Sequence, residues 1–187
     1  MILESISVIG FAIIIDLIFG DPKNRYHPTA WIGILIAKFT PLAKNNNPTF
    51  EKIGGILIVI IISSIFVLLL SGLDIGISLI STDYVSLIIS VLIGALLLKT
   101  TIAIRGMEKH ATSVLESLES NNIDMARNYL SMIVKRNTTN LDKNHVLSGV
   151  LESISENTVD GITGPMFYYA FFGLWLSLIH ISEPTRR

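Results

Sequence analysis

The uncharged apolar run Ile53–Leu73 constrains the fold of this 187-residue chain more than any other feature. It is 21 residues long, and a helix needs about 20 mostly apolar residues to cross a bilayer. Only 16% of all residues are charged, against about 25% in soluble domains. The mean hydropathy of +0.60 agrees with this. The sequence therefore predicts an all-α integral membrane protein.

Three further apolar runs bring the expected number of transmembrane helices to about four. The predicted spans are 2–19, 53–73, 84–104 and 162–181. We expect a short turn at 74–83. Residues 29–42 carry apolar side chains at helical spacing and end near a proline, which predicts an amphipathic helix at the membrane interface.

Residues 105–161 change character after the N-terminal membrane region 1–104. They are polar and poor in aromatic residues, and their apolar positions predict three short helices. The expected ranges are about 107–120, 124–134 and 141–156.

Lysine and arginine counts in the loops predict the orientation. Loop 20–52 holds five, loop 74–83 holds none and segment 105–161 holds six. This alternation predicts a multi-pass protein of the cell (cytoplasmic) membrane with its N-terminus outside. Loops 20–52 and 105–161 would both be cytoplasmic. The net charge of −1 argues against a nucleic-acid partner. The apolar runs make the lipid bilayer an expected partner.

Three charged residues, Glu4, Asp16 and Lys99, interrupt the apolar runs. Asp16 lies in the first run, where an ionisable group is either a functional residue or a juxtamembrane charge that reaches water. Lys99 lies near the end of the third run, where we expect its long side chain to reach the headgroups.

The segment Leu151–Pro165, LESISENTVDGITGP, concentrates polar groups at the junction with the last apolar run. Glu152 and Glu156 are four residues apart, so they share one face of a helix. With Asn157 and Asp160 they offer oxygen ligands of the kind that magnesium prefers. The alternative is a solvated helix face without a ligand.

Further candidates lie elsewhere on the predicted cytoplasmic side. Asp21 and His27 lie in a loop that either is rigid and supplies an acid and a base, or is a helix stop followed by a polar turn. Arg105 and Arg136 could bind phosphate or a substrate carboxylate, or they are ordinary positive-inside residues. Walker-type and GxGxxG loops are absent from the sequence, so nucleotide chemistry would need another architecture.

Four sequence motifs resemble the CobD/CbiB family of cobalamin-biosynthesis membrane proteins, the adenosylcobinamide-phosphate synthases. They are GDP at 20–22, HP at 27–28, SMIVKRNT at 131–138 and ESISENTVDGITGPMFYYA from Glu152 onward. The Glu-Asn-Thr-x-Asp-Gly core is the specific part of the match.

The resemblance implies ATP- and magnesium-dependent amide formation. A propionate of the corrinoid adenosylcobyric acid would be joined to (R)-1-aminopropan-2-ol or its O-phosphate. On this view Glu156 and Asp160, assisted by Glu152, hold magnesium. Arg136, with Arg105, contacts phosphate or substrate. Asp21 or His27 orients or deprotonates the amine, and Asn157 belongs to the catalytic set.

The chain departs from the family pattern in two ways. Lys135 and Asn137 replace a glycine and an aspartate of the central motif, so a ligand role at position 137 is not expected. The family's second half is absent, so we expect a C-terminally truncated member that is inactive alone. We expect residues 182–187 to be a non-native tail.

Two other readings stay open from the sequence. One is a non-enzymatic regulatory membrane protein similar to AmpE, which shares the central motif. The other is a small-molecule transporter, against which the lack of ionisable residues in the middle spans counts. Expected protein partners are further copies of the chain or other membrane proteins of the corrinoid pathway.

Overall fold

The computed structural model describes residues 2–20, 27–80 and 83–181, and this part of the chain is helical without strands. The prediction of an all-α protein is confirmed. In chain order the elements are α1 (Ile2–Phe19), α2 (Pro28–Ala43), α3 (Pro48–Ile80), α4 (Asp83–Lys99), α5 (Ile104–Glu119), α6 (Ile123–Ser131), α7 (Lys143–Thr158), the π-helix η2 (Val159–Thr163), α8 (Gly164–Phe172) and α9 (Leu174–Ile181).

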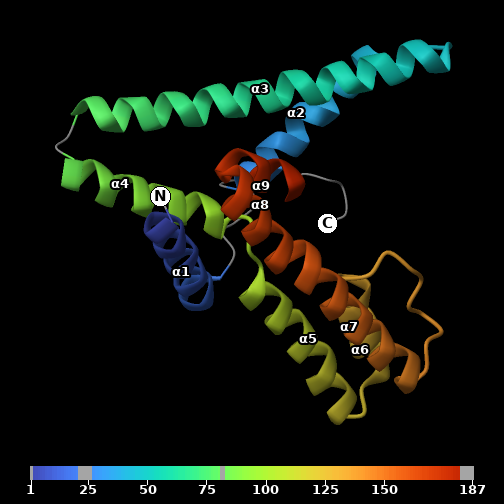
Figure 1. Ribbon diagram of the computed structural model, residues 1–187. Coiled ribbons are helices and arrows are strands. Elements are labelled where there is room, and N and C mark those ends of the chain that lie inside the picture. The colour runs from blue at the N-terminus through green and yellow to red at the C-terminus, as the bar shows by residue number, and fades with distance from the viewer. Residues whose placement is uncertain (1, 21–26, 81–82, 182–187) are drawn as a thin grey trace.

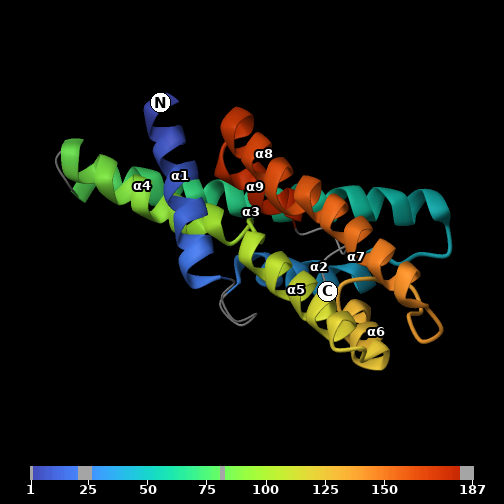
Figure 2. The same ribbon diagram turned by 90° about the horizontal axis from the view of Figure 1, so that it is seen from below.

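The helices form two regions that meet at the start of α5 (Figure 1). The long helix α3 packs against α2, α4 and α9, and α1 packs against α4. Helices α5, α6 and α7 form a separate bundle that points away from α3 and α4 (Figures 1 and 2). The rod formed by α7, η2 and α8 runs from this bundle to the apolar helices, so it joins the two regions.

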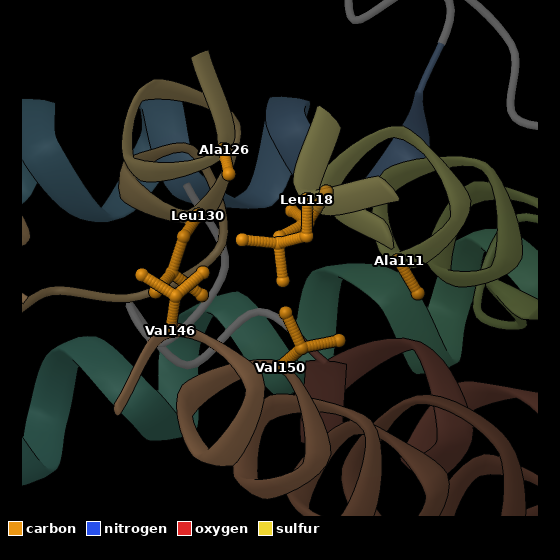
Figure 3. Close-up of a cluster of buried hydrophobic side chains, with 7 residues drawn as sticks. Ala111, Leu118, Ala126, Leu130, Val146 and Val150 are labelled. Carbon is orange, nitrogen blue, oxygen red and sulfur yellow. The ribbon is translucent and has the colours of Figure 1, made fainter. Parts of the chain in front are cut away.

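The apolar region has two small cores, and the α5–α7 bundle has a third. Val8, Ala12, Ala95, Leu98 and Ile102 are buried between α1 and α4. Ile32, Ile62 and Leu178 are buried where α2, α3 and α9 meet. The core of the α5–α7 bundle is the largest of the three and consists of Ala111, Val114, Leu118, Ala126, Leu130, Val146 and Val150 (Figure 3).

Within the described residues, two stretches are long and apolar enough to cross a membrane, judged by length and composition. They are Pro48–Leu79 and Tyr84–Glu119. Only 6% of the apolar window in the first is buried inside the protein, so most of its side chains face outward. The predicted number of four spans stays a prediction.

The turn predicted at 74–83 is wrong for most of its length, because α3 continues to Ile80. This part of the helix contains no proline, and a long helix tolerates the cost of about 1 kcal/mol at a single glycine such as Gly76.

The helix predicted to run to residue 104 ends at Lys99 instead. The amides of Thr100, Thr101 and Ile102 bond to carbonyls three residues back. The hydroxyls of Thr100 and Thr101 also bond to carbonyls three residues back, those of Leu97 and Leu98. Threonine side chains compete in this way with regular helical bonding, and the chain turns into α5 here.

The last apolar run is also not the single span that we expected at 162–181. Gly173 has a φ of +86°, a conformation open mainly to glycine, and it separates α8 from α9. Helix α9 folds back against α8 rather than extending it (Figure 1).

Candidate functional site

The predicted site segment Leu151–Pro165 lies on the rod of α7, η2 and α8. Pro165 has no N–H, so it cannot donate to the carbonyl of Gly161 four residues earlier. The chain forms one turn of π-helix here, in which the amide of Gly164 bonds to the carbonyl of Val159. Short π-helical segments are frequent at functional sites.

The Gly161 carbonyl is satisfied by a distant partner. It accepts a hydrogen bond of 3.1 Å from the backbone amide of Ala103, just before α5. Gly161 itself is buried. The π-helical turn is therefore attached to the start of α5 through the backbone.

The three predicted metal ligands point outward from the rod. Glu152, Glu156 and Asp160 follow each other at intervals of four residues, and all three are exposed. Across 2–20, 27–80 and 83–181, no three or more histidine, aspartate or glutamate side chains are grouped so as to hold a metal ion. Glu156 and Asp160 fit magnesium by the type of donor, and their assignment stays a prediction.

Glu152 has a different local role. Its Oε2 lies 2.7 Å from Nη2 of Arg136, with both side chains about half exposed. The guanidinium of Arg136 also lies over Gly149, where an added Cβ would come within 2.9 Å of Nη2. Glu152 and Gly149 thus hold Arg136 against α7. Gly149 was not among the predicted site residues, although a glycine inside the predicted helix 141–156 often marks a close packing contact.

Asn157 faces inward from the rod. Its Nδ2 donates to the carbonyl of Ser153 at 2.8 Å and to the Ser153 hydroxyl at 3.3 Å. The Ser153 hydroxyl donates to the carbonyl of Ile133 at 3.4 Å. These bonds connect the two family-like motifs through buried Ser153, which sequence reasoning did not single out.

The loop that carries Arg136 is held by side chain to backbone bonds. Buried Thr138 donates from its hydroxyl to the carbonyl of Arg127, and Nε of Arg127 donates to the carbonyl of Leu141. Oδ1 of Asn137 accepts from the amide of Thr139, as asparagine does in many turns. Asn137 therefore stabilises the turn after Arg136.

Asp142 caps the N-terminus of α7. Its Oδ1 accepts from the backbone amide and from Nδ1 of His145, each at 2.9 Å. The backbone hydrogen bond from His145, followed by the side-chain one, lowers the pKa of Asp142 below its ordinary value. This cap fixes where the rod begins.

The structure describes only one member of the predicted acid and base pair of loop 20–52. Asp21 lies outside the described residues. His27 is 9% exposed and stands at the start of α2, where its carbonyl accepts from the amides of Ala30 and Trp31. Helix α2 packs against α3 and α9, whereas the acids of the motif lie on α7 and η2.

Arg105 holds the end of α1. Its Nη1 donates to the carbonyl of Leu17 at 3.1 Å and to the carbonyl of Ile18. Its side chain also passes close to Gly20, whose φ of +67° favours glycine and where an added Cβ would lie 3.2 Å from Cδ of Arg105. This accounts for the glycine of the GDP motif. The predicted contact of Arg105 with substrate stays a prediction.

Asp16 and Lys99 are both buried, at 0% and 5% exposure. Nζ of Lys99 lies 3.6 Å from Oδ1 of Asp16. The expectation that Lys99 extends to the headgroups is wrong, because its side chain turns inward and is buried beside Asp16.

A cavity of about 280 Å³ lies between α2, α3 and α9. Apolar side chains such as Ile32, Ile58 and Ile62 line most of it, with Lys44 and Glu51 among the few charged ones. None of the predicted site residues lines this cavity.

The profile of the family described as CobD/Cbib protein matches residues 9–181. The cobalamin biosynthesis protein CobD of Leptospira interrogans (strain Fiocruz L1-130) is 38% identical over 177 residues, which cover 95% of this chain and 54% of the relative. That of Halalkalibacterium halodurans is 33% identical over 185 residues, 99% of this chain and 56% of the relative.

A third relative is also similar over most of this chain. The probable cobalamin biosynthesis protein CobD of Thermoplasma volcanium is 35% identical over 163 residues, 87% of this chain and 51% of the relative. The chain thus spans about half the length of the curated relatives it matches. No solved structure matches it. Because the family profile covers all but the two ends of the sequence, including its four motifs, the chain belongs to the CobD/CbiB family.

Proposed function

We propose that this chain acts in cobalamin biosynthesis, in the ATP-dependent formation of an amide bond. The substrates would be a propionate of adenosylcobyric acid and (R)-1-aminopropan-2-ol or its O-phosphate. The observation that carries the proposal is the family match over residues 9–181, which includes the Glu-Asn-Thr-x-Asp-Gly segment. The relatives reported above are all named for cobalamin biosynthesis, which favours the synthase over the AmpE-like alternative.

The reaction requires activation of a carboxylate. Bound ATP with magnesium would supply a phosphoryl group to activate the propionate carboxylate, and ADP would leave. The amine nitrogen would then form the amide bond at the activated acyl carbon, and phosphate would leave. Glu156 and Asp160 are the exposed oxygen donors that would hold magnesium. Glu152 is the weaker ligand candidate, because its carboxylate is paired with Arg136.

Arg136 would contact phosphoryl oxygens. An arginine whose guanidinium is already oriented loses less side-chain freedom when it binds an anion, and charged donors stabilise developing negative charge. Its contact with Glu152 and its seat on Gly149 provide that orientation. Asp21 or His27 would accept the proton that the attacking ammonium group must lose. Asn157 would support the rod from inside through Ser153.

Genetic complementation tests the proposal directly. A strain that lacks the synthase receives this chain or a version extended to the full length of its relatives, and growth on a corrinoid precursor is measured. We expect rescue by the extended version. Absence of rescue by either form would contradict the proposed reaction.

Alanine variants of the extended version test the metal assignment. We expect Glu156→Ala and Asp160→Ala to lower synthase activity at least about a hundredfold, as loss of a group that stabilises transition-state charge does. Glu119→Ala, an exposed acid at the end of α5, is the matched control and should retain activity. Full activity of both site variants would remove the assignment.

A further inference from the structure

The start of α5 is held by two distant parts of the chain. Oδ2 of Asp16 accepts from the amide of Ile104 at 2.9 Å and from the amide of Arg105 at 3.1 Å. The preceding amide, that of Ala103, donates to the Gly161 carbonyl in η2. The first amides of a helix have no partner inside it, so here α1 and η2 supply partners for three consecutive amides.

The contact between α1 and α5 is reciprocal. Asp16 accepts from the first amides of α5, while the guanidinium of Arg105 donates to the last carbonyls of α1. Each charge has the sign that the facing helix end favours, negative at an N-terminus and positive at a C-terminus. Lys99, at the end of α4, adds its ammonium on the other oxygen of Asp16. One buried carboxylate therefore joins three helices.

We propose that Asp16 is a positioning residue for the candidate site. Its carboxylate fixes the start of α5, the Ala103 amide then holds the Gly161 carbonyl, and this bond keeps the π-helical turn that carries Asp160 in place. The role in activity depends on the proposed function, whereas the coupling between Asp16 and the turn does not.

Proline at position 165 makes this coupling possible. Any other residue would present an N–H to the Gly161 carbonyl and complete an ordinary helical bond. The carbonyl would then be shared with, or withdrawn from, Ala103. The carboxylate of Asp16 and the missing amide of Pro165 thus act on the same backbone bond from opposite sides.

Hydrogen exchange of the whole chain in lipid nanodiscs tests the coupling without any substrate. In Asp16→Ala, we expect amides of segments 100–106 and 158–165 to exchange about tenfold faster, as loss of a buried hydrogen bond produces. Segment 123–131 in α6 should not change. Asp74→Ala, an exposed aspartate of α3, is the matched control and should match the wild type throughout. Faster exchange in 100–106 alone would overturn the coupling.

Asp16→Ala leaves Lys99 as a buried charge without its carboxylate, which destabilises a protein strongly. Two further variants therefore test the coupling with a milder change. Asp16→Asn retains an oxygen acceptor, so we expect it to protect both segments better than alanine does. Pro165→Ala leaves Asp16 in place and adds the competing amide, so we expect faster exchange at 100–106. Wild-type exchange at 100–106 in Pro165→Ala would overturn the proposal, whatever Asp16→Ala does.

Kinetics of the extended version separate this proposal from the proposed function. For Asp16→Asn we expect kcat to fall between about tenfold and about a hundredfold, with the KM for ATP within about twofold, since a misplaced group affects the reacting geometry first. An unchanged kcat would contradict the positioning role. If the wild type has no synthase activity, the proposed function fails while the exchange result still decides the coupling.

Discussion

The α5–α7 bundle buries its apolar side chains inside the protein, whereas helix α3 exposes most of its own. In the bundle, the apolar residues gather on one side of each helix and seven of them form a closed core (Figure 3). In α3, large apolar side chains such as Ile56, Leu68 and Leu69 are more than half exposed. Both regions are built from α-helices, so the difference lies in how apolar residues are distributed along each helix.

This difference shows where the hydrophobic effect can act. Water favours a helix that hides an apolar stripe, as α5 and α7 do, and the stability of the bundle comes from that burial. An apolar surface as extensive as that of α3 does not persist in water and needs lipid or another protein to cover it. The candidate site lies on the rod that connects these two environments.

The largest expected effect on stability comes from shortening a buried leucine in the bundle, compared with an exposed leucine in α3. Leu130→Ala empties a fully buried position in the bundle and should lower the free energy of unfolding by about 2–5 kcal/mol. Leu68→Ala, at 72% exposure on α3, should change it by less than about 0.5 kcal/mol. Urea unfolding of the whole chain in detergent measures both. Equal losses would break the comparison.

A methyl group added at a glycine should have opposite effects on the free energy of unfolding in the two regions. Gly149→Ala brings a Cβ within 2.9 Å of Arg136 and 3.1 Å of Leu130, so overpacking should cost about 1–3 kcal/mol. Gly72→Ala on α3 meets no atom within 4 Å and should stabilise the helix by up to about 1 kcal/mol. The same unfolding assay reports both signs. Stabilisation by Gly149→Ala would show that Arg136 does not rest on the glycine.

The helix caps should respond differently to pH. The pKa of Asp142 is lowered in the folded protein, so its contribution to stability is fully present above the ordinary value of 3.8 and is lost as the pH falls through the folded pKa. Asp142→Ala should therefore destabilise at pH 7 and lose this effect in acid. Asn47 caps α3 with an amide that does not titrate, through a bond from the amide of Thr49. Asn47→Ala should cost about 1 kcal/mol at either pH. A pH-independent loss at Asp142 would contradict the cap.

The smallest expected effect on stability is at the ion pair of the site. The Arg136 and Glu152 side chains are 45% and 53% exposed, and exposed pairs contribute about 0–1 kcal/mol. Glu152→Gln should leave the unfolding midpoint nearly unchanged, and under the proposed function it should weaken the binding of ATP at Arg136. Isothermal titration with ATP, compared with Glu119→Gln, measures the second effect. A large stability loss would mean that the pair holds the rod instead of orienting the arginine.

Much of the local structure followed from the sequence. The apolar run 2–19 predicted α1 with the observed bounds, and the amphipathic stretch 29–42 predicted α2 within one residue at each end. Three helices were expected in 105–161, and α5, α6 and α7 are there. These predictions succeed because the spacing of apolar residues and the strong local signals of proline and glycine act within a few residues of each other.

The site could be predicted only in part. The motif at Leu151–Pro165 was recognisable, but the pairing of Glu152 with Arg136 and the inward bonds of Asn157 were not. Both contacts depend on how the loop after α6 folds over α7. The break at Gly173 also escaped prediction, because a glycine in an apolar run is compatible with a continuous helix until another helix offers a better surface to pack against.

The sequence by itself determined that the chain is helical and which stretches are apolar, because composition and periodicity are local properties of the chain. Its motifs indicated the family, which the family profile over residues 9–181 confirms. Only the tertiary structure decided what the charged groups do. Asp16 and Arg105 each satisfy the end of a helix that lies more than eighty residues away in sequence. A carboxylate or a guanidinium can serve a helix end, a metal or a substrate, and the choice depends on which end the fold brings beside it.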